Sequence, residues 1–160
     1  MTIQVGDRLP EAQFNVLKDG VQVLSTEDIF GQGKVLLFAV PGAFTPTCSA
    51  RHLPGYTDQT RRFAELGIRL VCIAVNDAFV MDAWGKSQNT PDDILMLADG
   101  NAEFTRALGL ELDASGFGMG IRSKRYALYS EDGTVKGLWV EAPGEFKVSA
   151  AEYVLTQLTG

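Results

Sequence analysis

The sequence predicts an α/β sandwich with a mixed central sheet, helices on both faces and an N-terminal β-hairpin extension. Apolar strand-like runs alternate with helical patterns through the middle of the chain, which is typical of parallel β-α-β units. Two hairpin patterns, one near each end, add antiparallel strands. Because no repeat, low-complexity tract or linker-like run divides the 160 residues, we expect one domain, residues 1–160.

The first predicted element is the hairpin. Gln13–Leu17 and Val21–Leu24 carry apolar residues at alternating positions, and a Lys-Asp-Gly turn separates them. The next run, Val35–Val40, is apolar throughout and ends at Pro-Gly, so it predicts a central strand covered on both faces. From Cys48 to Leu66 the apolar spacing is helical, and we expect the helix to bend at Pro54 and Gly55.

Alternation continues through the middle of the chain. Ile68–Val75 predicts a second buried strand, and Asn76-Asp77 is an N-cap signal for a helix over Ala78–Lys86. Ile94–Ala98 predicts a third strand, and Ala102–Leu108 a short helix that ends at a glycine.

The last third of the chain changes pattern. Tyr126–Ser130 and Val135–Val140 flank an Asp-Gly turn, which indicates an antiparallel pair and therefore a mixed sheet. Ser149 and Glu152 form a capping-box pattern ahead of a helix. One face of that helix is apolar and should pack on the sheet; it consists of Ala151, Val154, Leu155 and Leu158. This order of elements describes a thioredoxin-like sandwich.

Charge and composition exclude several classes of function. A net charge of −6 disfavours nucleic acids and anionic membranes as partners, and a small neutral or polar substrate fits better. No apolar run approaches the roughly 20 residues that span a bilayer. The N-terminus has no signal-peptide pattern, so we expect a cytoplasmic protein. The two cysteines and one histidine form no Cys-x-x-Cys or His-x-x-x-His pair, and we expect no metal and no other cofactor.

The chemistry is expected between Pro41 and Gly55, directly after the central strand. If the helix opens at Pro46 or Thr47, Cys48 lies in its first turn, where free N–H groups and the helix dipole favour a thiolate. The hydroxyl of Thr45 is placed to donate to the sulfur or to a bound oxygen, while Pro41 would shield the loop from water. The alternative is that Cys48 is a small buried hydrophobe. A strand-to-helix turn argues against that alternative because such turns expose their residues.

His52 lies one helical turn beyond Cys48 on the same face. This spacing raises a second possibility, a Cys–His nucleophile pair of the kind that cysteine hydrolases use. No third member of such a site is signalled. A dithiol oxidoreductase is a further alternative, but it needs a second cysteine three residues away, where the chain has Arg51.

The motif Pro41-x-x-x-Thr45-x-x-Cys48 resembles the active-site signature of the peroxiredoxins. The longer string Pro-Gly-Ala-Phe-Thr-Pro-Thr-Cys-Ser, followed by His-Leu-Pro-Gly, is similar to the peroxiredoxin-5 subfamily. Val-Asn-Asp-Ala-Phe from Val75 and Arg-Ser-Lys-Arg-Tyr-Ala from Arg122 also resemble that subfamily, so the likeness extends across nearly the whole chain.

The resemblance implies that Cys48 attacks a peroxide oxygen and becomes a sulfenic acid while water or an alcohol leaves. Pro41, Thr45 and Arg125 match the remaining active-site positions of the family. The guanidinium of Arg125 would donate to the thiolate and to the leaving oxygen. The other interpretation of Arg125 is a surface charge at the start of a strand, and the alternatives Arg122 and Lys124 do not fall on the family's position. His52 and Phe44 are expected to support the site.

Cys72 lies in the middle of an apolar strand and is expected to be an inert core residue. Some family members carry a resolving cysteine late in the chain, but residues 100–160 contain none. We therefore expect an external thiol, glutathione with glutaredoxin or thioredoxin, to reduce the sulfenic acid. The resemblance also implies activity on hydrogen peroxide and organic hydroperoxides.

Several apolar side chains near the site are core candidates first: Phe44, Phe79, Trp84, Phe117 and Met119. The resemblance implies that part of this set instead buries against a second copy of the chain, so we expect a homodimer. The remaining alternative to an enzyme is a redox sensor or chaperone-like binding module that uses the same thiol without rapid turnover.

Overall fold

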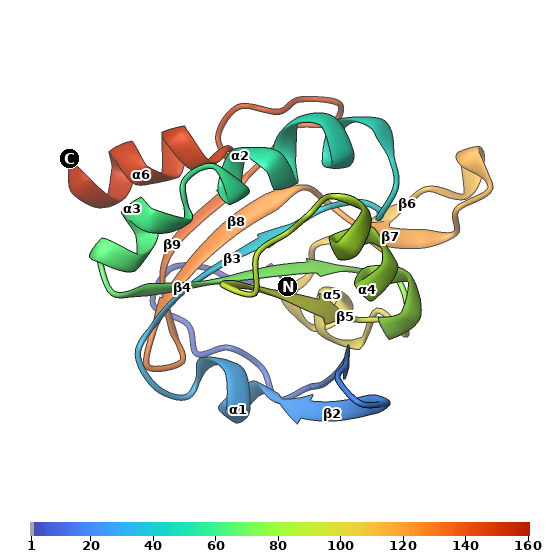
Figure 1. Cartoon of the computed structure of the whole chain (residues 1–160), viewed down its shortest axis with the longest axis horizontal. Coiled ribbons are helices and arrows are strands. Elements are labelled where there is room, and N and C mark those ends of the chain that lie inside the picture. The colour runs from blue at the N-terminus through green and yellow to red at the C-terminus, as the bar shows by residue number, and fades with distance from the viewer. Residues whose placement is uncertain (1) are drawn as a thin grey trace.

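A seven-stranded mixed sheet forms the centre of the computed structural model, which describes residues 2–160 (Figure 1). The strand order is β2-β1-β5-β4-β3-β8-β9. The strands of this sheet are β1 (Gln13–Leu17), β2 (Val21–Ser25), β3 (Lys34–Ala39), β4 (Ile68–Ala74), β5 (Ile94–Ala98), β8 (Tyr126–Glu131) and β9 (Thr134–Val140). The α-helices are α1 (Thr26–Phe30), α2 (Leu53–Thr57), α3 (Thr60–Glu65), α4 (Ala78–Ser87), α5 (Glu103–Leu108) and α6 (Ala151–Thr159).

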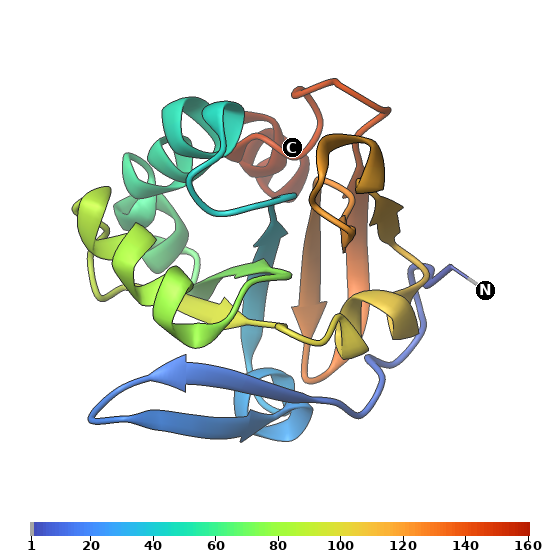
Figure 2. The ribbon, with the colours of Figure 1, turned by 90° about the vertical axis from the view of Figure 1, so that its right-hand side faces the viewer.

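The sheet is mixed because its centre is parallel and its two sides are antiparallel. Strand β4 runs parallel to both β3 and β5, whereas β8 runs antiparallel to β3 and to β9. The β1–β2 hairpin joins the edge of β5 through the single pair Asn15–Ala98. Figure 2 shows this hairpin lying crosswise at the foot of the sheet. The predicted strands and both hairpins are therefore confirmed.

Two hydrophobic cores lie on opposite faces of the sheet. One is covered by α2, α3, α4 and α6, which contribute side chains such as Tyr56, Phe63, Trp84 and Val154. The other is covered by α1, α5 and the N-terminal segment. Helices on both faces were predicted, and the predicted apolar face of α6 packs against the first core, with Leu158 only partly buried.

The predicted bend at Pro54 and Gly55 is wrong. The chain is helical from Pro46, passes through a π-helical segment, η1 (Cys48–His52), and continues into α2 without a break. The N–H of Leu53 bonds to the carbonyl of Cys48, five residues back. This wider turn accommodates Pro54, which has no N–H to donate. The helix breaks later, at a turn over residues 58–59 that leads into α3.

The predicted capping box at Ser149 is also wrong. Helix α6 has Ala150 as its N-cap and no side-chain cap, because the Ser149 hydroxyl donates to Glu141 instead. A capping box that the sequence analysis missed lies at the start of α1, where Ser25 and Asp28 bond to each other's backbone N–H groups.

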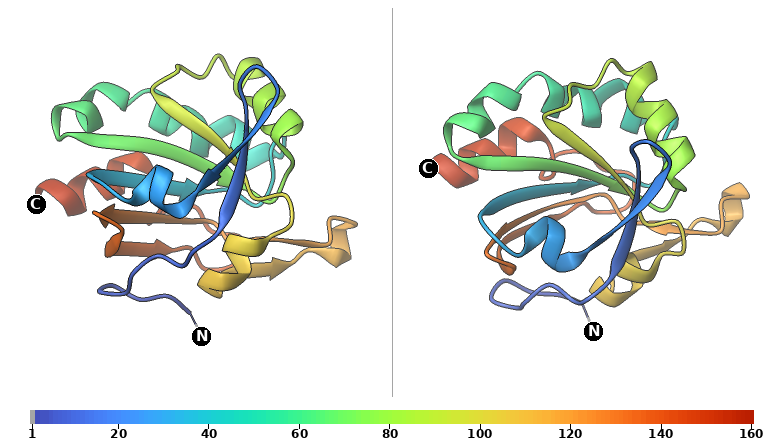
Figure 3. Two further views of the ribbon diagram at one scale, coloured as in Figure 1. Left: turned by 90° about the horizontal axis from the view of Figure 1, so that it is seen from below. Right: turned by 60° about the horizontal axis from the view of Figure 1, so that its bottom comes forward.

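A second, two-stranded sheet was not predicted. It consists of β6 (Glu111–Asp113) and β7 (Ile121–Ser123), joined by a loop that contains the short 3-10 helix η2 (Ser115–Phe117). Figure 3 shows this hairpin projecting from the body of the molecule. The side chain of Phe117 at its tip is 86% exposed.

Candidate active site

Three strand ends meet at one edge of the sheet and build the site. Because β8 is antiparallel to β3, its first residue, Tyr126, lies opposite Ala39 at the end of β3. On its other side, Tyr126 lies opposite Val140, the last residue of β9. The turn after β3, Arg125 before β8 and Glu141 after β9 are therefore neighbours, and the Glu141 N–H bonds to the Arg125 carbonyl at 2.9 Å.

The guanidinium of Arg125 links the two predicted reactive side chains. Its Nη2 donates to the sulfur of Cys48 at 3.2 Å, and its Nη1 donates to Nδ1 of His52 at 2.8 Å. Both partners come from the same helical segment, more than 70 residues away in the chain. The structure thus brings together three of the predicted site residues. Arg122, the alternative arginine, donates instead to the backbone carbonyls of Met119 and Val75.

Cys48 lies in the first turn of the helix, as predicted, but its side chain is fully buried. The expectation that the strand-to-helix turn exposes this residue is wrong. The turn packs under the segment that follows β9, whose Phe146 ring lies against His52 at a centroid distance of 5.0 Å. Burial places the contact between the sulfur and the Arg125 guanidinium in a region of low dielectric, where the attraction of a cation for an anion is strong.

The two ring nitrogens of His52 have different partners, and these partners define its tautomer. The Ser149 carbonyl, 3.2 Å from Nε2, can only accept, so Nε2 carries the proton and the Nδ1 lone pair accepts from Arg125. Burial, and then the charge of Arg125, lower the pKa of His52 to about 3, although the bond to Ser149 opposes the shift. His52 is neutral at physiological pH and both its nitrogens are engaged, which does not fit the Cys–His pair of a hydrolase.

The other predicted site residues shape the turn. The Thr45 hydroxyl donates to the carbonyl of Gly42 at 2.6 Å, so its proton does not point at the sulfur. Phe44 has a φ of 64°, which is rare for a bulky residue, and its side chain is 56% exposed.

The aromatic core candidates divide into exposed and buried residues. The interpretation of Phe44, Phe79 and Phe117 as core residues is wrong, because all three are exposed. Trp84 is a core residue, and its indole N–H donates to the hydroxyl of Ser49, next to Cys48, at 2.9 Å.

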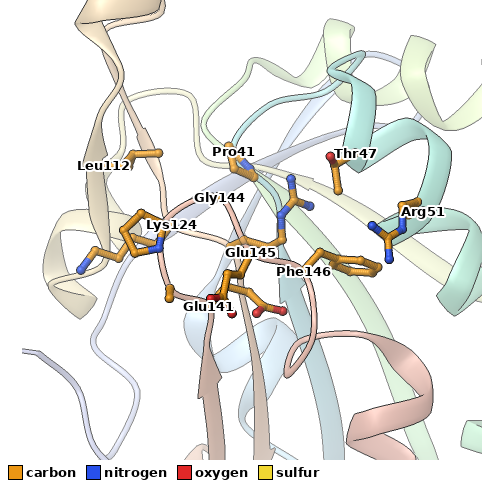
Figure 4. A pocket seen from close by; sticks show the side chains of 12 residues that line it. Pro41, Thr47, Arg51, Leu112, Lys124, Glu141, Gly144, Glu145 and Phe146 are labelled. Atoms are coloured by element: carbon orange, nitrogen blue, oxygen red, sulfur yellow. The ribbon is translucent and has the colours of Figure 1, made fainter.

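A cavity of about 260 Å³ lies beside Arg125 (Figure 4). Arg125, Thr47 and Pro41 form part of its wall and are close to Cys48 in space or in sequence. The remaining lining side chains are Arg51, Leu112, Lys124, Glu141, Ala142, Pro143, Gly144, Glu145 and Phe146. Pro41 lines this cavity, and its shielding of the loop from water stays a prediction.

The segment after β9 supplies residues that the sequence analysis missed. The Phe146 ring faces the guanidinium carbons of Arg51 at 4.7 Å and of Arg125 at 5.8 Å, which are cation–π distances. Nothing in the local pattern of residues 142–148 signals this packing. Glu141 could have been found, because it flanks a predicted hairpin strand directly opposite Arg125.

Cys72 is a buried core residue, as predicted. It pairs with Phe38 in the register of β3 and β4 and belongs to the same apolar cluster as Cys48. Burial, and then the nearby Cys48, raise the pKa of its thiol well above the usual value. Both cysteines are free thiols.

Two features are absent from residues 2–160. No group of three or more His, Cys, Asp or Glu side chains in this range is arranged to hold a metal ion. No helix in the same range has the length and apolar character needed to cross a membrane.

Comparisons with known proteins define the class. Residues 4–155 match the family model described as Redoxin, so the chain belongs to the redoxin family. Peroxiredoxin-2E-2, chloroplastic, from Oryza sativa subsp. japonica is 47% identical over 164 residues, which cover 98% of this chain and 73% of the rice protein.

Two solved structures show which members of the redoxin family the chain resembles. Reduced Prx3 in complex with H₂O₂ from Vibrio vulnificus is 50% identical, with a TM-score of 0.94 over 98% of this chain and 99% of that chain. Peroxiredoxin 5 from Alvinella pompejana is 36% identical, with a TM-score of 0.86 over 98% of both chains. The protein is therefore a thiol peroxidase of the peroxiredoxin class, related to peroxiredoxin 5, and the predicted thioredoxin-like fold is confirmed.

Proposed function

We propose that Cys48 is the thiolate that peroxide oxidises. The sulfur attacks the terminal oxygen of R–O–O–H, the O–O bond breaks, and the leaving oxygen takes a proton to become water or an alcohol. Cys48 is left as a sulfenic acid. The observation that carries this proposal is the 3.2 Å contact between Arg125 Nη2 and the Cys48 sulfur, because a fixed cation there stabilises a thiolate.

Arg125 has a second proposed role in the transition state. As the O–O bond breaks, negative charge develops on the leaving oxygen, and a guanidinium already held in place stabilises it without reorganisation. His52 keeps the guanidinium oriented by accepting from Nη1. Thr45 stabilises the turn through Gly42 and can turn its hydroxyl toward bound peroxide, and Pro41 limits water at the mouth of the site.

Burial of Cys48 sets the path that a substrate takes. The cavity beside Arg125 has room for a small peroxide, and Arg125 both lines the cavity and contacts the sulfur. We propose that peroxide enters here and reaches the sulfur past the Arg125 guanidinium. Apolar lining from Leu112, Pro143 and Phe146 would also accommodate the carbon chain of an organic hydroperoxide.

An external thiol is proposed to complete the cycle. Its sulfur displaces water from the Cys48 sulfenic acid to give a mixed disulfide, and a second thiol then releases Cys48. Support comes from the buried position of Cys72 and from the absence of any cysteine in residues 100–160. Glutathione with glutaredoxin and thioredoxin are the two candidate reductants, and steady-state turnover with each distinguishes them.

The test compares two serine variants. Cys48→Ser should abolish peroxide consumption in the presence of a recycling thiol, whereas the matched control Cys72→Ser should retain it. Retained activity in Cys48→Ser would overturn the assignment of the nucleophile. After one equivalent of peroxide, mass spectrometry of the wild-type protein should find one added oxygen on Cys48; a Cys48–Cys72 disulfide would instead remove the proposal of an external reductant.

We also propose a homodimer that uses the exposed aromatic side chains near the site. Phe44, Phe79 and Phe117 are 56%, 62% and 86% exposed, so their rings are free to bury against a second copy of the chain. Sedimentation should give about twice the monomer mass of 17.3 kDa. A purely monomeric species at micromolar concentration would contradict the proposal.

A reducing compartment, the cytoplasm, is the proposed location. Support comes from the two cysteines, which form no disulfide with each other, as is usual for proteins of reducing compartments. The relative from rice is named as chloroplastic, so a fluorescent fusion expressed in the source organism is the decisive measurement.

A further inference from the structure

The carboxylate of Glu141 has an unusual set of partners. One oxygen, Oε2, accepts three hydrogen bonds from the segment before α6: from the Lys147 N–H at 2.7 Å, the Ser149 N–H at 2.8 Å and the Ser149 hydroxyl at 2.6 Å. The residue is only 7% exposed. Burial by itself raises the pKa of Glu141, but these hydrogen bonds outweigh it and hold the pKa below the usual value. Glu141 is therefore a buried anion with a defined structural partner.

Ser149, the partner of Glu141, also contacts the residues around the proposed reaction centre. Ser149, held by its N–H and its hydroxyl, presents its carbonyl to the helix that carries Cys48. That carbonyl accepts from the Tyr56 hydroxyl at 2.6 Å and from Nε2 of His52 at 3.2 Å. Because a carbonyl can only accept, its position decides which nitrogen of His52 keeps the proton.

We propose that Glu141 is a positioning residue for the peroxidase reaction, which acts by holding the Ser149 carbonyl where it keeps His52 in the tautomer that accepts from Arg125. The inference rests on the proposed roles of Cys48 and Arg125. It adds to them that the orientation of the guanidinium depends on a carboxylate whose hydrogen bonds go to Lys147 and Ser149 rather than to Cys48 or Arg125. The chain of contacts runs from Glu141 through Ser149 and His52 to Arg125 and the sulfur.

Loss of the Glu141 carboxylate should change the protonation of His52. The charged or titratable groups that face the imidazole are Arg125, which donates to Nδ1, and Tyr56, whose ring centroid lies 5.7 Å away. From the last loop, the Ser149 carbonyl accepts from Nε2 and the Phe146 ring packs against the imidazole. Without the Ser149 carbonyl held in place, the loop can admit water. Water relieves the burial that is the main cause of the low pKa of His52, so this pKa should rise from about 3 toward its ordinary value of about 6.5, although the charge of Arg125 and the lost bond to Ser149 oppose the rise. An imidazolium has no lone pair at Nδ1, so it cannot accept from Arg125 and repels it.

The single histidine of the chain makes this change directly observable. In ¹⁵N-labelled wild-type protein, the imidazole signals should show a proton on Nε2 alone and should not move between pH 5 and pH 8. In Glu141→Ala they should titrate within that range. Glu141→Gln keeps an oxygen that can accept the same three hydrogen bonds, so it should restore the wild-type spectrum.

Kinetics provide the second readout. Glu141→Ala should lower kcat/KM for hydrogen peroxide by about ten- to a hundredfold, the range for a displaced active-site group, with the loss growing below about pH 6.5. Glu141→Gln should recover most of the rate. In a His52→Leu background, Glu141→Ala should cause no further loss, because it acts through His52.

Several results would overturn the inference. These are a wild-type imidazole spectrum in Glu141→Ala, equal losses in the Ala and Gln variants, or full additivity with His52→Leu. If Glu141→Ala does not fold, Ser149→Ala removes only one of the three donors and should show the same spectral change to a smaller degree; no change there would also refute the inference. Full activity in Cys48→Ser would instead refute the proposed function itself, so the two failures are distinguishable.

Discussion

Replacement of Arg125 by lysine tests the centre of the proposed mechanism while keeping the positive charge. The guanidinium makes two directed contacts at once, 2.8 Å to His52 Nδ1 and 3.2 Å to the Cys48 sulfur. An ammonium is a point donor on a flexible stem and cannot reproduce this fork. Lysine at position 125 can therefore contact the sulfur or His52, but not both in the present geometry.

The expected size of the effect follows from the lost contact. A hydrogen bond to a charged group contributes about 1.5–3 kcal/mol, which corresponds to roughly a 10- to 150-fold change in rate if the bond is made fully in the transition state. We expect Arg125→Lys to lower the second-order rate constant with peroxide by a factor in this range. Arg125→Met, which also removes the charge, should lower it further.

Intrinsic tryptophan fluorescence is a suitable assay. The indole of Trp84 donates to Ser49, the residue after Cys48, so oxidation of the sulfur should change its emission during rapid mixing with peroxide. The control is Arg62→Lys, because Arg62 lies on the surface and pairs with exposed Glu152 at 3.3 Å. Unchanged rates in Arg125→Lys and Arg125→Met would refute the proposed role of the guanidinium.

Two further predictions concern stability and the cover of the site. Asp77→Ala removes the N-cap bond to the Val80 N–H and should reduce the free energy of unfolding by about 1 kcal/mol in urea titrations, whereas the surface variant Glu152→Ala should change it by less than about half of that. Phe146→Leu removes the ring that faces the Arg125 guanidinium and should lower kcat/KM about two- to fivefold, since exposed cation–π contacts contribute about 0.5–1 kcal/mol. A rate equal to wild type would show that Phe146 only fills space.

Local patterns predicted the parts of the fold that depend on local physics. The apolar run of β3, the Asn-Asp signal before α4 and the Asp-Gly turn between β8 and β9 all appear at the predicted places. The position of Cys48 in the first helical turn follows from the proline and threonine before it. These features need only neighbouring residues, and the structure agrees with the sequence for that reason.

The environment of Cys48 could not be predicted in the same way. Cys48 is buried in a cluster with residues of β3, β4, α4 and α6, and its neighbour His52 is covered by the segment after β9, which reaches the site only through the register of β8 and β9. The capping-box pattern at Ser149 misled for a related reason: the serine hydroxyl donates to a buried carboxylate eight residues earlier instead of accepting from an N–H group of its own helix. Arg125 was identified through the family resemblance, and its contact with the sulfur has no signal in the spacing of the two residues.

The neutral state of His52 gives a prediction about stability that is independent of catalysis. Burial and Arg125 lower its pKa to about 3 in the folded protein, against about 6.5 in an unfolded chain. Between these values only the unfolded state binds the extra proton, so stability is complete above about pH 6.5 and is lost as the pH falls. The slope is about 1.4 kcal/mol per pH unit.

His52→Gln isolates this contribution. A glutamine can accept from Arg125 and donate to the Ser149 carbonyl, yet it does not titrate. Between pH 6.5 and pH 4.5 the wild-type free energy of unfolding should fall by about 2 to 3 kcal/mol more than that of the variant in urea titrations. Carboxylates such as Glu141 also lose stability in acid, but they do so in both proteins and cancel in the difference. If the unfolding free energies of the wild type and the variant fall in parallel with pH, His52 accepts a proton in the folded state as it does in the unfolded chain. The resulting imidazolium has no lone pair at Nδ1, so the contact with the Arg125 guanidinium would be lost.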